Sequence, residues 1–142
     1  FGYKNFSKKQ KNYLIHLIKL LSKKYRINKR NILGHSDIAP NRKKDPGEKF
    51  PWKSLARKNL SIWHGLSKKK LQKFRKKKCY KVLQKKFLYN LSKIGYSKEG
   101  HKIISKSKYL RFSIIAFQRR FRPELIDGKI DQECLLISQK LI

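Results

Sequence analysis

Apolar residues recur at helical spacing near the amino end of the chain. They occupy positions i, i+3, i+4, i+7 and i+11 of one stripe, namely Leu14, Leu17, Ile18, Leu21 and Tyr25. Ser7 precedes this stripe and Gln10 follows three positions later, which is the spacing of a capping box. The pattern predicts an amphipathic helix that begins after Ser7.

The segment that follows this predicted helix contains glycines and prolines at intervals and shows no helical spacing. Ile32 and Leu33 form a short apolar pair that is typical of a buried β-strand. The residues from Gly34 to Pro51 include glycines and prolines at intervals, which predicts a long and constrained loop. Pro51 then suits the start of a short helix, with Trp52, Leu55 and Ala56 on its inner face. For residues 1–66 we expect part of an α/β fold with an exposed hydrophobic sheet edge, because half a domain cannot close its core.

A second apolar set begins after a basic stretch at residues 67–78, which we interpret as a linker or a solvated helix start. Residues 79–142 carry three helical stripes, each with a defined start or stop. The expected core positions are Leu83, Phe87, Leu91, Ile114, Phe117, Phe121 and Leu136. Gly95 ends the first predicted helix, Pro123 ends the second, and Asp131 caps the third. We therefore expect a small all-α module of three helices.

The chain of 142 residues has a formal charge of +31, which predicts attraction to nucleic acid, anionic lipid or acidic wall polymers. Lysine is spread along the whole chain, however, so we favour a compositional bias with a solvated linker over a selected polyanion-binding surface, which is the alternative. No RNA-binding aromatic signature, zinc-finger spacing or leucine zipper accompanies it, and we expect no specific nucleic-acid partner. No apolar run is long enough for a transmembrane segment. Cys79 and Cys134 are interpreted as small buried thiols, with a disulfide as the alternative.

His35, Lys43 and Asp45 stand together in the constrained loop. An imidazole nitrogen and a carboxylate oxygen are common zinc ligands, and His35 and Asp45 could converge on one ion. Lys43 lies between them in sequence and could stabilise an oxyanion beside the metal. Taken as a bare spacing, one histidine and one aspartate are far more often ordinary polar groups of a loop than metal ligands.

The full string of this loop, GHSDIAPNRKKDPGEKFPW, resembles the carboxyl-terminal half of the zinc-dependent N-acetylmuramoyl-L-alanine amidases, the type 2 amidase family. Such enzymes cleave the amide between N-acetylmuramic acid and the L-alanine of the stem peptide. The resemblance implies that His35 and Asp45 are two of three protein ligands of Zn²⁺ and that Lys43 stabilises the tetrahedral intermediate. In the family, the other ligand histidine and a catalytic carboxylate precede these residues. We expect that His16, His64 and His101 do not replace that histidine and that Asp37 bonds to loop amides.

The strings LSKIGY and AFQRRFRPELIDGKID, which begin at Leu91 and Ala116, resemble a peptidoglycan-binding helical domain. Together the two resemblances imply a peptidoglycan hydrolase whose partners are peptidoglycan or muropeptides, located in the cell envelope or, alternatively, the cytoplasm. Because the chain starts at Phe1 and lacks the third ligand, we expect an incomplete fragment without turnover of its own. The alternatives are a non-catalytic peptidoglycan-binding remnant and a basic nucleic-acid-binding protein. The sequence does not indicate an oligomeric state.

Overall fold

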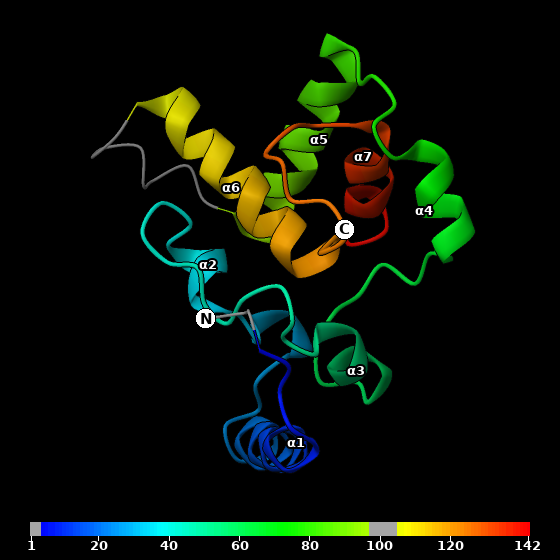
Figure 1. Cartoon of the computed structure of the whole chain (residues 1–142). Coiled ribbons are helices and arrows are strands. Elements are labelled where there is room, and N and C mark those ends of the chain that lie inside the picture. The colour runs from blue at the N-terminus through cyan, green and yellow to red at the C-terminus, as the bar shows by residue number, and fades with distance from the viewer. Residues whose placement is uncertain (1–3, 97–104) are drawn as a thin grey trace.

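The computed structural model describes residues 4–96 and 105–142, and every regular element in these residues is helical. Helix α1 (Lys8–Lys24) lies at one end of the molecule (Figure 1). At the other end, α5 (Lys81–Ile94), α6 (Lys106–Phe121) and α7 (Gln132–Gln139) pack together, with α4 (Lys68–Phe74) beside them. Between these two groups run three short elements: η1 (Lys29–Asn31), α2 (His35–Ile38) and α3 (Trp52–Arg57). None of the described helices is long and apolar enough to cross a membrane.

The prediction of an α/β fold for residues 1–66 is wrong. Ile32 and Leu33 belong to no strand, and the isolated β-bridge among the described residues joins Lys78 to Asp131 elsewhere in the chain. A strand requires a neighbouring strand to satisfy its backbone groups, and none of the described segments offers one here. The carbonyl oxygen of Ile32 instead accepts a hydrogen bond of 3.0 Å from the Arg120 guanidinium. The expected sheet edge is therefore absent from the described part of residues 1–66.

Helix α1 begins as predicted. The Ser7 hydroxyl accepts a hydrogen bond of 3.1 Å from the backbone N–H of Gln10, and the Gln10 side chain accepts one of 2.8 Å from the backbone N–H of Ser7. These reciprocal bonds form the capping box. They are local, which explains why the sequence alone located this helix start.

The packing of α1 is shallow, since none of its residues is buried. One side, with Leu14, Ile15 and Ile18, contacts a small core made of Trp52, Leu55 and Leu60. A second stripe points into solvent at positions i, i+4 and i+7, where Tyr13, Leu17 and Leu20 are 66%, 52% and 49% exposed. This stripe is an apolar face without a partner among the described residues.

The carboxyl-terminal helices enclose a larger core. Phe87 on α5 and Phe117 and Phe121 on α6 are almost completely buried, and their rings contact one another. Helix α5 ends at Gly95 in the left-handed conformation, and Asp131 caps α7 by accepting from the backbone N–H of Cys134, both as predicted.

The basic stretch at residues 67–78, expected as a linker or a solvated helix start, contains helix α4, whose Leu71 is buried in the same core. Cys79 and Cys134 are free, buried thiols rather than a disulfide. Burial raises the pKa of Cys134 to about 12, so this thiol stays protonated and unreactive at neutral pH.

Candidate metal centre

The structure brings together two of the predicted site residues. His35 is the first residue of α2 and Asp45 lies ten positions later in the loop, yet His35 Nδ1 and Asp45 Oδ2 are 2.7 Å apart. Their side chains are 65% and 38% exposed, so both polar groups face solvent and are reachable by a ligand. The pair therefore presents a nitrogen and an oxygen donor side by side at the surface.

Backbone contacts hold the two ends of this loop together. The backbone N–H of Ser36 donates a hydrogen bond of 3.0 Å to the carbonyl oxygen of Asp45. Gly34 lies so close to Pro46 that a Cβ atom added to it would be 2.6 Å from the proline Cδ. Glycine is therefore required at this position by close approach of the chain, and the sequence motif encodes the closure of the loop.

The electrostatic environment keeps Asp45 ionised. Desolvation alone would raise its pKa, but hydrogen bonds from His35 and from the backbone, with the charges of His35 and Lys43, hold the pKa of Asp45 below its ordinary value. The charge of Lys43 is the smallest of these contributions to the lowered pKa of Asp45. An ionised carboxylate is the form that binds a metal ion.

Asp37 has a structural role in supporting the loop that carries His35. Its carboxylate accepts a hydrogen bond of 2.9 Å from the backbone N–H of Gly34, as expected for a residue bonded to loop amides. The same carboxylate also accepts a bond of 2.7 Å from the Tyr96 hydroxyl and forms a buried ion pair with Arg120. Arg120 in turn lies 4.0 Å from the centre of the Trp52 ring. The loop is therefore fixed to α6 and to the end of α5.

Sequence reasoning missed the contributions of Tyr96 and Arg120. They lie 59 and 83 residues from Asp37 in the chain, inside a segment that we interpreted as a separate helical module. Two neighbouring arginines in AFQRRF gave no signal of this role, because cations are frequent throughout the sequence. Only the tertiary contact distinguishes Arg120 from the other basic residues.

The donor types present at the site fit zinc, but their number is too small. His and Asp are both established zinc ligands. The described residues contain no group of three or more His, Cys, Asp or Glu side chains that could hold a metal ion. His16 is exposed on α1, His64 is buried beside Trp63, and His101 lies outside the described residues. Within the described part of the chain, the candidate centre thus consists of two donors.

The chain is similar in sequence to known amidases. Residues 1–48 match the family described as N-acetylmuramoyl-L-alanine amidase. Over 137 residues the chain is 31% identical to the N-acetylmuramoyl-L-alanine amidase AmiD of Escherichia coli K12, covering 96% of this chain and 49% of AmiD.

Solved structures are similar as well. One is the Escherichia coli AmiD complex with the substrate anhydro-N-acetylmuramic acid-L-Ala-D-gamma-Glu-L-Lys (TM-score 0.77, 32% identity, 96% of this chain and 52% of that chain). Another is AmpDh3 of Pseudomonas aeruginosa with anhydromuramic pentapeptide (TM-score 0.78, 29% identity, 99% of this chain and 55% of that chain). The chain spans about half the length of the relatives it matches. In its first 48 residues the chain is similar to the N-acetylmuramoyl-L-alanine amidase family, and over nearly its whole length it is similar to about half of AmiD.

Proposed function

We propose that this chain forms the carboxyl-terminal part of a zinc-dependent peptidoglycan hydrolase, which cleaves the amide between N-acetylmuramic acid and L-alanine of the stem peptide. The observation that carries the proposal is the 2.7 Å approach of His35 Nδ1 to Asp45 Oδ2 in a segment that matches the amidase family. The substrate named for AmiD and the anhydromuramic pentapeptide bound to AmpDh3 support this substrate class.

In this proposal, His35 and Asp45 bind the zinc ion. The bound ion would polarise the scissile carbonyl and lower the pKa of a water molecule. Lys43 supplies a positive charge for the oxygen that becomes negative as the amide carbon turns tetrahedral. The loop contacts of Asp37 keep His35 in position. No third metal ligand gathers at this site among the described residues. From the resemblance to the amidase family, the proposal assigns the third ligand and the carboxylate that moves the proton to residues that precede His35 and Asp45 in the complete hydrolase.

We further propose that residues 79–142 bind peptidoglycan and that the protein acts in the cell envelope. The helical strings that resemble a peptidoglycan-binding domain support this assignment. Retention of the chain on insoluble peptidoglycan at 0.5 M NaCl would support it, because salt at that concentration screens simple charge attraction by a chain of formal charge +31.

Zinc titration by calorimetry tests the metal ligands. The chain alone is expected to bind zinc weakly, and His35→Ala or Asp45→Ala should remove that binding, whereas His16→Ala on the exposed surface of α1 should leave it unchanged. Equal zinc binding by His35→Ala and by the unaltered chain would contradict the proposal.

Activity requires a complete site, so we would fuse the chain to the amino-terminal half of AmiD and measure release of stem peptide from muropeptide. Lys43→Ala in the fusion should keep zinc and lose about a hundredfold in rate, as when one oxyanion donor is removed. Lys44→Ala, an exposed neighbour, is the matched control. Turnover by the chain alone would show that the two-donor description is wrong. Peptidoglycan retention without zinc binding would favour the non-catalytic remnant.

A further inference from the structure

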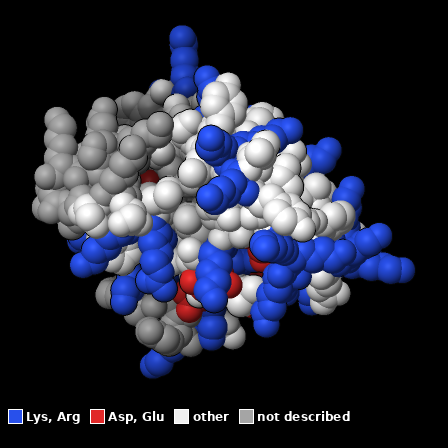
Figure 2. Space-filling model, turned by 90° about the horizontal axis from the view of Figure 1, so that it is seen from above, with Lys and Arg blue, Asp and Glu red and all other residues white. Residues whose placement is uncertain are grey.

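Each described carboxylate of this protein lies next to an arginine or histidine side chain. Of its eight acidic residues, all but Glu99 are described, and each described carboxylate lies within 4.0 Å of an arginine or histidine nitrogen. On the face of the molecule that Figure 2 shows, lysine and arginine side chains (blue) far outnumber aspartate and glutamate side chains (red). Most cations therefore have no acidic neighbour, and a selected anion site must differ from this background by its shape.

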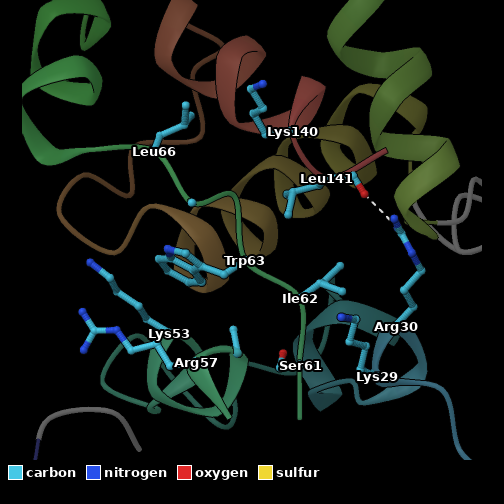
Figure 3. Close-up of a pocket in the computed structure, with 12 residues that line it drawn as sticks. Lys29, Arg30, Lys53, Arg57, Ser61, Ile62, Trp63, Leu66, Lys140 and Leu141 are labelled. Carbon is cyan, nitrogen blue, oxygen red and sulfur yellow. Dashed lines mark hydrogen bonds between the residues drawn. The ribbon is translucent and has the colours of Figure 1, made fainter. Parts of the chain in front are cut away.

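One cavity differs in this way. It has a volume of about 550 Å³ and lies between α3, η1 and the carboxyl end of the chain (Figure 3). This volume lies within the usual range of small-molecule sites. Its lining includes five cations and no acidic residue, and the cations are Lys29, Arg30, Lys53, Arg57 and Lys140. Residues 34–51, which contain the candidate metal centre, do not line it.

Two groups of cations line this cavity. Lys29 donates a hydrogen bond of 2.6 Å to the Asn59 side chain, and Arg30 donates one of 2.8 Å to the carbonyl oxygen of Leu141, so these two are already engaged. Lys53 and Arg57 make no hydrogen bond or ion pair with the part of the chain that the structure describes. They are four positions apart on α3 and therefore lie on the same side of that helix, as Figure 3 shows.

An aromatic side chain forms a fixed wall next to these cations. Trp63 lies in the centre of the cavity view in Figure 3, with Lys53 and Arg57 to one side. Its ring is held by contacts with His64, at 4.7 Å between ring centroids, and with Phe121, at 6.0 Å. The cavity thus combines free ammonium and guanidinium groups with a rigid apolar surface, which is the composition of a ligand site rather than of a solvated lysine patch.

We propose that this cavity binds a phosphorylated ligand, with Lys53 and Arg57 on the phosphate and Trp63 against its apolar part. Phosphate suits these groups better than carboxylate, because it carries up to two charges and its oxygens match both the guanidinium fork and an ammonium group. The ligand is either a small phosphorylated molecule or a segment of a phosphodiester polymer. This inference does not rest on the amidase proposal, since no residue of the metal loop takes part.

The test compares two double variants with the same loss of charge. Lys53→Gln/Arg57→Gln removes the two free cations of the cavity, and Lys85→Gln/Lys86→Gln removes two exposed cations of α5 that do not line it. Binding of pyrophosphate and of a short poly(glycerol phosphate) is measured by calorimetry and by amide chemical shifts at 0.15 M NaCl. The indole N–H signal of Trp63, assigned with Trp63→Phe, reports locally on the cavity. Unchanged circular dichroism establishes that each variant is folded.

We expect saturable binding of at least one probe with one site per chain, and a shift of the Trp63 indole signal. The cavity variant should raise the Kd at least tenfold, whereas the α5 variant should change it less than twofold. Preference for pyrophosphate identifies a small ligand, and preference for the oligomer identifies a polymer. Equal weakening by both double variants, shifts spread over lysines of all helices, or no saturable binding of either probe would overturn the proposal.

Discussion

The two ends of this molecule bury their apolar side chains to very different degrees. In the carboxyl-terminal region, Phe87, Phe117 and Phe121 are almost completely buried in one core that α4, α5, α6 and α7 share. In the amino-terminal region, none of the 17 residues of α1 is buried. The small core of this region consists of Trp52, Leu55 and Leu60, on and near α3. The first region has a closed core, and the second has an open one.

The candidate metal loop lies between these regions. The carboxyl-terminal region, which has the closed core, supports this loop through buried polar contacts. Arg120 of α6 forms a buried ion pair with Asp37, and the Tyr96 hydroxyl donates a hydrogen bond to the same carboxylate. Arg119 adds a weaker ion pair with Glu48, at 3.9 Å. The helices that we interpreted as a separate wall-binding module thus help to hold the loop that carries His35. The domain boundary that the sequence places near residue 67 remains a prediction.

The largest effect is expected for Arg120→Met. This substitution leaves the Asp37 carboxylate buried without its cation, and breaking a buried pair in this way costs about 4 kcal/mol. Urea unfolding followed by circular dichroism measures the loss. Arg119→Met is the matched control, because its partner Glu48 is 3.9 Å away and partly exposed, and it should cost less than about 1 kcal/mol. Similar losses for the two neighbours would show that the Asp37 contact does not support the loop.

Phe117→Ala comes next. Phe117 is fully buried, so truncation removes its contacts with Phe87 and Phe121 and leaves a cavity, at a cost on the order of 3 kcal/mol. The same unfolding experiment applies. A loss under about 0.5 kcal/mol would mean that the helical core is not as closed as described.

A smaller effect concerns pH and the buried His64, which lies where the two regions meet. Burial lowers the pKa of His64 to about 4 from an ordinary value of 6.5. A hydrogen bond with the Phe121 backbone and the negative charge of Glu124 oppose this shift, whereas the positive charge of Lys53 adds to it. The unfolded chain therefore binds more protons than the folded chain between about pH 6.5 and 4. The stabilising contribution is complete above pH 6.5 and is lost as the pH falls toward 4.

The expected loss over this interval is on the order of 1–2 kcal/mol, after allowance for solvent screening. Unfolding free energies measured from pH 7 to pH 4 should show it in the unaltered chain and in His16→Gln, whose histidine is exposed. In His64→Gln the additional slope should disappear. An unchanged slope in His64→Gln would assign the pH dependence to other groups.

The smallest effect is expected on the open side of the molecule. Leu17 is 52% exposed on α1, so Leu17→Ala should change the free energy of unfolding by less than about 0.5 kcal/mol. Ile18→Ala, on the side of the helix that contacts the small core, should cost more. If Leu17→Ala were the more destabilising of the two, the exposed stripe of α1 would be covered in solution and the contrast between the regions would not hold.

Several features follow from the sequence alone because they depend on neighbours in the chain. The capping box of Ser7 and Gln10, the helix stop at Gly95 and the cap at Asp131 each involve residues within about one helical turn. Helical stripes likewise identified the buried faces of α5 and α6. The glycines and prolines from Gly34 to Pro51 led us to expect a constrained loop on which His35 and Asp45 could converge, and their side chains do meet at 2.7 Å. Their role as zinc ligands comes from the family resemblance and stays a prediction.

The remaining features depend on partners far away in the chain, and only the tertiary structure decided them. Whether Ile32 and Leu33 form a strand depends on another strand beside them, and the described residues supply an arginine instead. The choice of Arg120 rather than its neighbours as the partner of Asp37 spans 83 positions and leaves no local signature in so basic a sequence. The cavity near Trp63 arises for the same reason, because it exists only where α3, η1 and the carboxyl end of the chain meet.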